Sequence, residues 1–211
     1  GSDIYIINSE DGILYRFGAN EEHPDFRPII DTPLTDIDSE TTLIVYDEYR
    51  IAFLSKNGAL SFFNAYLSDT PLRVFADQDI TGVQFSDDGK KLLFFSSHET
   101  FVYFIRPWEV QPRRDQDSIW QIGRFADEIS FVQWTKDYEH ILYTKGSQVF
   151  ITELDNRDRR NINELIRFER PPLQVLSRVS QNQIFFIKDN SNESVELLSI
   201  DFPEFNNFFT Q

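Results

Sequence analysis

An internal repeat constrains the fold of this chain more than any other feature of its sequence. Phe75 is followed by Val83-Gln84-Phe85 and Phe125 by Val132-Gln133-Trp134, at offsets of 50 and 49 residues. A second set of matches shifts by 43 residues and joins Phe125, Val132, Trp134 and Tyr143 to Phe168, Val175, Ser177 and Phe186. A unit of about 43 to 50 residues is typical of a repeat architecture, and the fold must be built from these units.

The clearest unit contains four predicted strands. They cover residues 80–85, 92–96, 100–105 and 120–125. The turn Ser86-Asp87-Asp88-Gly89-Lys90 separates the first two, since Asp and Ser bond back to their own backbone and Gly accepts a positive φ. No sustained helical periodicity is present. Four strands every 40 to 50 residues is the pattern of a β-propeller blade.

The other copies follow the same plan with less regularity. We expect strands at residues 43–46, 50–55, 59–65 and 72–75 in the second unit, with 32–42 as a connecting loop. The fourth unit covers 129–168 and the fifth starts near Leu173. At the N-terminus, residues 4–8, 13–17 and 27–30 supply three strands without an inner one. The prediction is an all-β, five-bladed β-propeller of four-stranded antiparallel blades, in one domain over residues 1–211.

The first blade is predicted to be partial. Closure by a strand from the other terminus would remove open sheet edges, which otherwise invite aggregation. Residues 205–209 can serve as the last strand of the fifth blade or as the missing inner strand of the first. The sequence leaves both pairings open.

The segment from Val83 to Phe94 resembles the WD40-like (PD40) repeats of TolB-type propellers, in which Ser-Pro-Asp-Gly-Lys joins two hydrophobic strands. Here Asp87 stands in place of the usual Pro, and the fourth unit has Thr135-Lys136-Asp137-Tyr138-Glu139 at the same position. The resemblance implies a bacterial, extracytoplasmic interaction domain, in the periplasm or at the cell surface. Propellers host unrelated activities, so the resemblance implies the fold more strongly than the function.

Charge narrows the range of partners. The formal net charge is −15, from 35 Asp and Glu against 20 Lys and Arg. A field of this sign repels phosphate backbones and anionic headgroups, so we expect no nucleic-acid partner. No apolar run is long enough to span a bilayer, so direct membrane insertion is not expected either. A protein partner is favoured, a glycan stays possible, and we expect a monomer.

Catalytic and metal-binding motifs are missing from the sequence. The chain has no cysteine, and its three histidines, His23, His98 and His140, do not recur at metal-ligand spacing. G-x-S-x-G, P-loop, G-x-G-x-x-G and H-E-x-x-H motifs are also absent. Asp87, Asp88 and Asp137 fit turn chemistry better than a calcium loop. We therefore expect no enzyme, no catalytic residues, no metal and no cofactor.

One predicted loop has the composition of a binding site. The insertion at residues 106–115 contains Trp108, Arg113 and Arg114, and a second charged connection contains Arg157, Arg159 and Arg160. Loops on rigid scaffolds often carry binding function, and Trp and Arg are enriched in interface hot spots. These six residues form the predicted partner-binding site. The alternative is that Trp108 packs over its own blade.

The alternative function is a carbohydrate-binding or glycoside-hydrolysing propeller. Asp36, Asp38, Asp79 and Glu128 lie at or just before predicted inner strands, which would place them near a central channel. Paired carboxylates are the catalytic groups of most glycosidases. Gly1-Ser2 has the form of a cloning remnant and no Met occurs, so we expect a domain taken from a longer protein.

Overall fold

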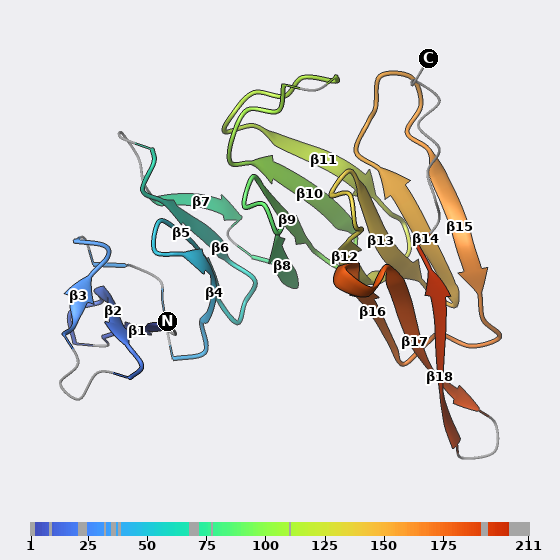
Figure 1. The fold of residues 1–211 in the computed structure, drawn as a ribbon, viewed down its shortest axis with the longest axis horizontal. Helices are drawn as coiled ribbons and strands as arrows, with labels where there is room; N and C mark the ends of the chain where they lie inside the picture. The colour runs from blue at the N-terminus through green and yellow to red at the C-terminus, as the bar shows by residue number, and fades with distance from the viewer. Residues whose placement is uncertain are drawn as a thin grey trace. The chain divides into compact units, whose positions relative to one another are not determined.

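A computed structural model describes the chain except residues 1–2, 9, 21–24, 32, 35–36, 38, 68–71, 77, 110, 191–193 and 203–211. Residues 1–83 and residues 84–211 form two compact units, which are described in turn. Among the described residues the only helical element is a 3₁₀ turn, Val179–Gln181, and no helix there is long and apolar enough to cross a membrane. The all-β prediction is confirmed (Figure 1).

The first unit contains two antiparallel sheets. The first sheet has the order β1-β2-β3, with β1 (Asp3–Ile7), β2 (Leu14–Gly18) and β3 (Arg27–Pro28). The second has the order β4-β5-β6-β7, with β4 (Thr42–Asp47), β5 (Arg50–Leu54), β6 (Leu60–Asn64) and β7 (Leu72–Ala76). Leu14, Ile51, Phe53 and Phe63 form the core between the two sheets. Three strands in the first sheet agree with the predicted partial blade.

The second unit contains three antiparallel sheets. The first has the order β11-β10-β9-β8, with β8 (Gly82–Phe85), β9 (Lys91–Phe95), β10 (Glu99–Phe104) and β11 (Ile119–Arg124); the unit boundary falls within β8. The next has the order β12-β13-β14-β15, with β12 (Ile129–Trp134), β13 (His140–Lys145), β14 (Gln148–Glu153) and β15 (Ile162–Arg167). The last has three strands, β16 (Gln174–Arg178), β17 (Gln183–Asn190) and β18 (Ser194–Asp201).

Successive sheets of the second unit pack face to face through apolar side chains. Leu93 and Val102 of the first sheet are buried against Val132 and Ile141 of the next. Leu142 and Val149 on the opposite face of that sheet are buried against Val175, Ile184 and Phe186. Strands buried on both faces read as continuous hydrophobic runs, which explains segments such as Leu92-Leu93-Phe94-Phe95.

The predicted turn chemistry is confirmed in two repeats. Ser86 Oγ donates to Asp88 Oδ1 at 2.7 Å, and the Lys90 amide donates to the same oxygen at 3.1 Å. Thr135 Oγ1 donates to Asp137 Oδ1 at 2.7 Å in the equivalent turn. These carboxylates satisfy the backbone and hydroxyl donors of the turns that join the first two strands of each sheet.

The repeated glutamine has a structural role that the sequence did not reveal. Gln133 Nε2 donates to the Val175 carbonyl at 2.6 Å, and Gln133 Oε1 accepts from the Ser177 amide at 2.8 Å. Gln84 makes the equivalent side-chain bond, since its Oε1 accepts from the Trp134 amide at 3.2 Å. In addition, the Gln84 backbone carbonyl accepts from the Trp134 indole Nε1 at 3.1 Å. Each glutamine therefore joins the inner strand of its own sheet to the inner strand of the next.

The predicted strands occur close to their expected positions. In the fourth repeat the last strand starts earlier than expected, at Ile162, because β14 and β15 form a long ladder. The segment 205–209, on which the closure prediction depends, lies outside the described residues. The five-blade count, closure by the other terminus and the single domain stay predictions.

Candidate protein-interaction surface

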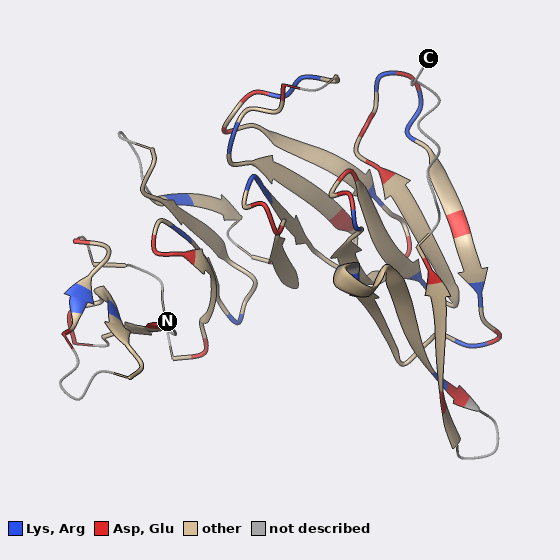
Figure 2. Cartoon of the chain, viewed as in Figure 1, with Lys and Arg blue, Asp and Glu red and all other residues tan. Residues whose placement is uncertain are grey.

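Four connections lie at one end of the sheets in the second unit, and we call them the loop end: residues 86–90, 105–118, 135–139 and 154–161. In an antiparallel sheet the turn after the first strand and the turn after the third strand fall at the same end. Figure 1 shows the connections from β10 to β11 and from β14 to β15 extending to the same side of the second unit, at the top of the view. Eight of the chain's 20 Lys and Arg residues lie in these loops. Basic and acidic residues are therefore concentrated in the loop-end connections of an otherwise acidic chain (Figure 2).

The longest of these loops is held closed by its own backbone. Trp108 and Arg114 exchange two hydrogen bonds, from the Trp108 amide at 2.8 Å and from the Arg114 amide at 3.0 Å. The half-buried Trp108 ring packs on the hydrophobic core of the second unit. Lys91 Nζ lies 3.9 Å from the centroid of that ring, a distance at which a cation is attracted to the π face.

Lys91 is a buried charge beneath the loop end, with a side chain only 1% exposed. Its Nζ donates to the Tyr138 carbonyl at 2.6 Å and pairs with the Glu139 carboxylate. Burial lowers the pKa of Lys91, and the opposing effect of Glu139 does not fully compensate. The ammonium thus ties the base of the loop end to the turn between β12 and β13.

Arg114 is also buried, with a relative exposure of 3%. Its guanidinium lies 4.6 Å from the Trp120 ring centroid and 5.2 Å from that of Phe104, and Nη1 donates to the Pro112 carbonyl at 2.8 Å. Burial lowers the pKa of Arg114, while Glu139 and Asp155 act to raise it. Stacking on two aromatic faces replaces much of the solvation that this guanidinium loses.

Arg160 joins the second predicted loop to the neighbouring sheet of the second unit. This half-buried side chain donates from Nη1 to the Ile122 carbonyl of β11, and its burial lowers the pKa of the guanidinium. Arg157 is more exposed and pairs with Asp155 through Nη2 at 2.6 Å. Arg159 is exposed and makes no ion pair within the described residues.

The structure thus brings the six predicted partner-binding residues to one end of the second unit, but it divides them into two groups. Trp108, Arg114 and Arg160 pack inward and form the base of the surface. Arg113, Arg157 and Arg159 are exposed to solvent. Sequence reasoning missed the buried Lys91. A signal for it was present, because the second strand of three sheets begins with a basic residue type: Arg50, Lys91 and His140.

The predicted channel carboxylates are not assembled into one described site. Asp36 and Asp38 lie outside the described residues. Asp79, in the first unit, is an exposed turn residue with a φ of 72° whose amide donates to the Asn57 carbonyl. Glu128, in the second unit, lines an open hollow of about 760 Å³.

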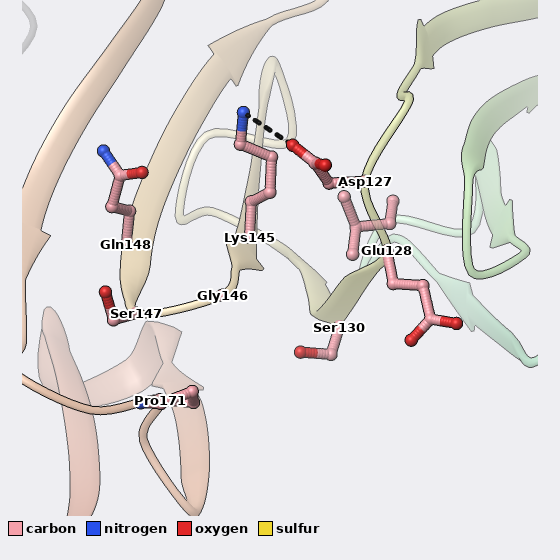
Figure 3. Close-up of a pocket in the computed structure, with 9 residues that line it drawn as sticks. Asp127, Glu128, Ser130, Lys145, Gly146, Ser147, Gln148 and Pro171 are labelled. Atoms are coloured by element: carbon pink, nitrogen blue, oxygen red, sulfur yellow. Dashed lines mark ion pairs between the residues drawn. The ribbon is translucent and has the colours of Figure 1, made fainter.

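That hollow lies at the opposite end of the sheets from the loop end. Glu128, Asp127, Lys145, Gln148 and Pro171 are among the residues around it (Figure 3). Lys145 Nζ and the Asp127 carboxylate are 3.6 Å apart, so two of the lining charges already balance each other. Among the described residues, no group of three or more His, Asp or Glu side chains is placed to hold a metal ion.

Comparison with known proteins identifies the fold. No protein-family model and no curated protein matches the chain. Solved structures do match. TolB from Acinetobacter baumannii is 16% identical with a TM-score of 0.50, and the match covers 95% of this chain and 50% of that one. A putative TolB from Agrobacterium tumefaciens is 13% identical with a TM-score of 0.53, with coverage of 90% and 70%. Chaetomium thermophilum Sqt1 is 14% identical with a TM-score of 0.54, with coverage of 91% and 52%.

The antiparallel sheets of three or four strands, the packing of one sheet on the next and these neighbours define a β-propeller-type fold. The chain spans about half the length of the A. baumannii TolB chain that it matches. At these identities the likeness concerns the fold alone.

Proposed function

We propose that this chain is a non-enzymatic β-propeller module that binds a protein partner at the loop end. The observation that carries the proposal is the division of the loop-end arginines. Arg113, Arg157 and Arg159 are presented to solvent above a base in which Lys91 and Arg114 are fixed by buried contacts. A rigid base lowers the entropy that the loop backbone loses on binding, which favours a defined interface.

The setting we propose is bacterial and extracytoplasmic. The TolB structures among the neighbours and the WD40-like repeat around residues 83–94 support it. The net charge of −15 supports a protein partner over nucleic acid.

The test compares two pairs of exposed arginines. Arg113→Ala with Arg159→Ala removes charge from the loop end, whereas Arg124→Ala with Arg167→Ala removes the same charge from β11 and β15. Proteins that the immobilised chain enriches from an extract of the source organism are quantified, and the enriched partner is then purified and titrated. We expect the loop-end variant to bind that partner at least about tenfold more weakly and the control variant to bind like the wild type. Equal binding by both variants would contradict the proposal.

A second candidate function rests on the hollow at the other end. Its carboxylates and the Gln148 amide are suited to hydrogen bonding with sugar hydroxyls, so a glycan is the ligand class it would take. A glycan array and a panel of chromogenic glycosides test this function. Glycan binding or glycoside turnover that is lost in Glu128→Gln would favour this function over the protein-binding module.

A further inference from the structure

Two arginines beneath the loop end keep buried donors that the described chain does not satisfy. Nε and Nη2 of Arg114 and Nε of Arg160 are buried and have no hydrogen-bond partner among the described residues. A guanidinium does not lose its proton in proteins, so each of these atoms is a charged donor. Buried donors are nearly always paired in native proteins, because an unpaired one loses its hydration without compensation.

The unpaired atoms of Arg114 form one intact edge of its guanidinium. Nη1 is occupied, since it donates to the Pro112 carbonyl at 2.8 Å. Nε and Nη2 donate side by side from the same edge, which is the fork that takes the two oxygens of a carboxylate or phosphate in parallel. The side chain that presents this fork is only 3% exposed and is held by the Trp120 and Phe104 rings.

The second guanidinium lies close to the first, on the same face of β11. Arg114 stacks on the Trp120 ring, and Arg160 Nη1 donates to the Ile122 carbonyl two residues further along the strand. Trp120 and Ile122 both pack into the core between this sheet and the next, as residues two apart on a strand do. All of these groups belong to the second unit, so their arrangement does not depend on the first.

The nearby carboxylates already have other partners. Burial lowers the pKa of both guanidiniums, and Glu139, Asp155 and Glu153 are the carboxylates that oppose it. Glu139 pairs with Lys91 and Asp155 with Arg157, and Glu153 Oε1 accepts from the Asn161 amide at 2.9 Å. Three carboxylates thus face four cations, which are Lys91, Arg114, Arg157 and Arg160. The cluster carries one positive charge in excess on a chain whose net charge is −15.

We propose that Arg114 and Arg160 form a binding site for a single carboxylate group. The Nε and Nη2 fork of Arg114 takes both carboxylate oxygens, and Arg160 Nε donates to one of them from the neighbouring connection. One negative charge balances the excess of the cluster. A dianion such as sulfate would leave a second charge buried without a counter-charge, which costs binding energy.

The connection at residues 155–160 gives the ligand a way in. None of these six residues makes a backbone–backbone hydrogen bond within the part of the chain that the structure describes, while the Glu153 amide and the Asn161 carbonyl close the base of the loop at 3.2 Å. Segments with few such bonds open at low cost in free energy. Arg160 belongs to this connection and is half-buried, so its guanidinium meets the ligand first.

The test follows the arginine Nε–H signals of the whole chain by two-dimensional NMR while sodium acetate replaces sodium chloride at constant ionic strength. The titration runs at about pH 7, where acetate is ionised, from about 1 to about 100 mM, the range expected for one charge-assisted bidentate contact. The Arg114 and Arg160 signals should shift together with a single dissociation constant. Sodium sulfate should bind at least about threefold more weakly than acetate.

Two substitutions separate the site from general attraction of anions. Arg160→Gln should raise the dissociation constant for acetate at least about tenfold, because it removes one charged donor. The matched control is Arg124→Gln on β11, whose wild-type side chain is 80% exposed and lies 3.5 Å from Glu99; it should bind acetate like the wild type. Circular dichroism checks that both variants are folded.

Three results would overturn the inference: Arg114 and Arg160 signals that acetate does not shift, a folded Arg160→Gln variant that binds acetate like the wild type, or tighter binding of sulfate than of acetate. A second arm identifies the source of the carboxylate and rests on the proposed function, because it titrates the purified protein partner. Competition by acetate would assign the carboxylate to an Asp or Glu of that partner, and partner binding unaffected by acetate would assign the site to a free acid. If no partner is enriched, the proposed function fails while the acetate titration still decides the site.

Discussion

Replacing Gln133 by Leu tests whether the repeated glutamine holds neighbouring sheets together. Leucine keeps most of the side-chain volume but removes both hydrogen bonds to the next inner strand, at the Val175 carbonyl and the Ser177 amide. A net contribution of about 0.5–1.5 kcal/mol for each bond gives an expected loss of about 1–3 kcal/mol in the free energy of unfolding. The side chain is half-buried, so water can partly replace the lost partners and values above this range are not expected.

Urea denaturation measures the global effect, and hydrogen exchange of the Ser177 amide measures the local one. Exchange at Ser177 should accelerate in Gln133→Leu, because its acceptor is gone. Gln133→Glu keeps that acceptor but loses the donor to Val175, so it should destabilise the chain while protecting Ser177. Gln121→Leu is the control, since Gln121 bonds Glu99 on the exposed surface. If Gln133→Leu unfolds at the same urea concentration as the control and Ser177 exchanges at the wild-type rate, the reasoning is refuted.

Three further predictions concern turns and buried charge. Gly58→Ala should destabilise by more than about 2 kcal/mol, because a Cβ there would lie 2.5 Å from the Asp79 and Ile80 amides at a φ of 83°. Gly146→Ala has open space and should cost only about 1 kcal/mol for its positive φ; equal midpoints in urea would contradict this difference. Glu139→Gln should destabilise the chain more than Lys91→Met does. The glutamine variant leaves the buried ammonium without its carboxylate partner, whereas the methionine variant leaves only a partly solvated carboxylate. The reverse order of melting temperatures would contradict this account. Burial disfavours the charged form of Asp137, but hydrogen bonds from His140 and from the turn outweigh it and hold the pKa well below its usual range, so its stabilisation is present above about pH 4 and lost as the pH falls. The stability difference between wild type and Asp137→Asn should therefore shrink on acidification, and a constant difference down to pH 2 would argue against this role.

The repeat could be read from the sequence because it reflects local chemistry. Strand alternation, the Asp of the first turn and the buried apolar positions all act within a few residues of one another. The structural role of the repeated glutamine, which is to bond the inner strand of the next sheet, could not be predicted in the same way. Gln133 and Ser177 are 44 residues apart, and only the packing of neighbouring inner strands brings them together.

The predicted partner site shows a different limit. Composition identified Trp108, Arg113 and Arg114, but the short ladder between Trp108 and Arg114 decides which side chains turn inward. Adjacent residues in such a ladder point to opposite sides, so Arg114 stacks on aromatic rings while Arg113 faces solvent. Arg113 and Arg114 are the same residue type but differ in exposure. The loop sequence does not reveal which of the two turns inward.

The repeat also bears on what the exposed residues mean. Leu197 taken alone is an ordinary exposed leucine, since apolar atoms make up much of any protein surface. Its neighbour across the ladder is Ile187, next to a Phe185 that occupies the position where Leu93 and Leu142 are fully buried. A position that is apolar in three copies and covered in two is informative in the third, because the same backbone geometry presents the same surface. The exposed apolar positions of β16, β17 and β18 are therefore the same sheet surface that a neighbouring sheet covers in the two preceding repeats.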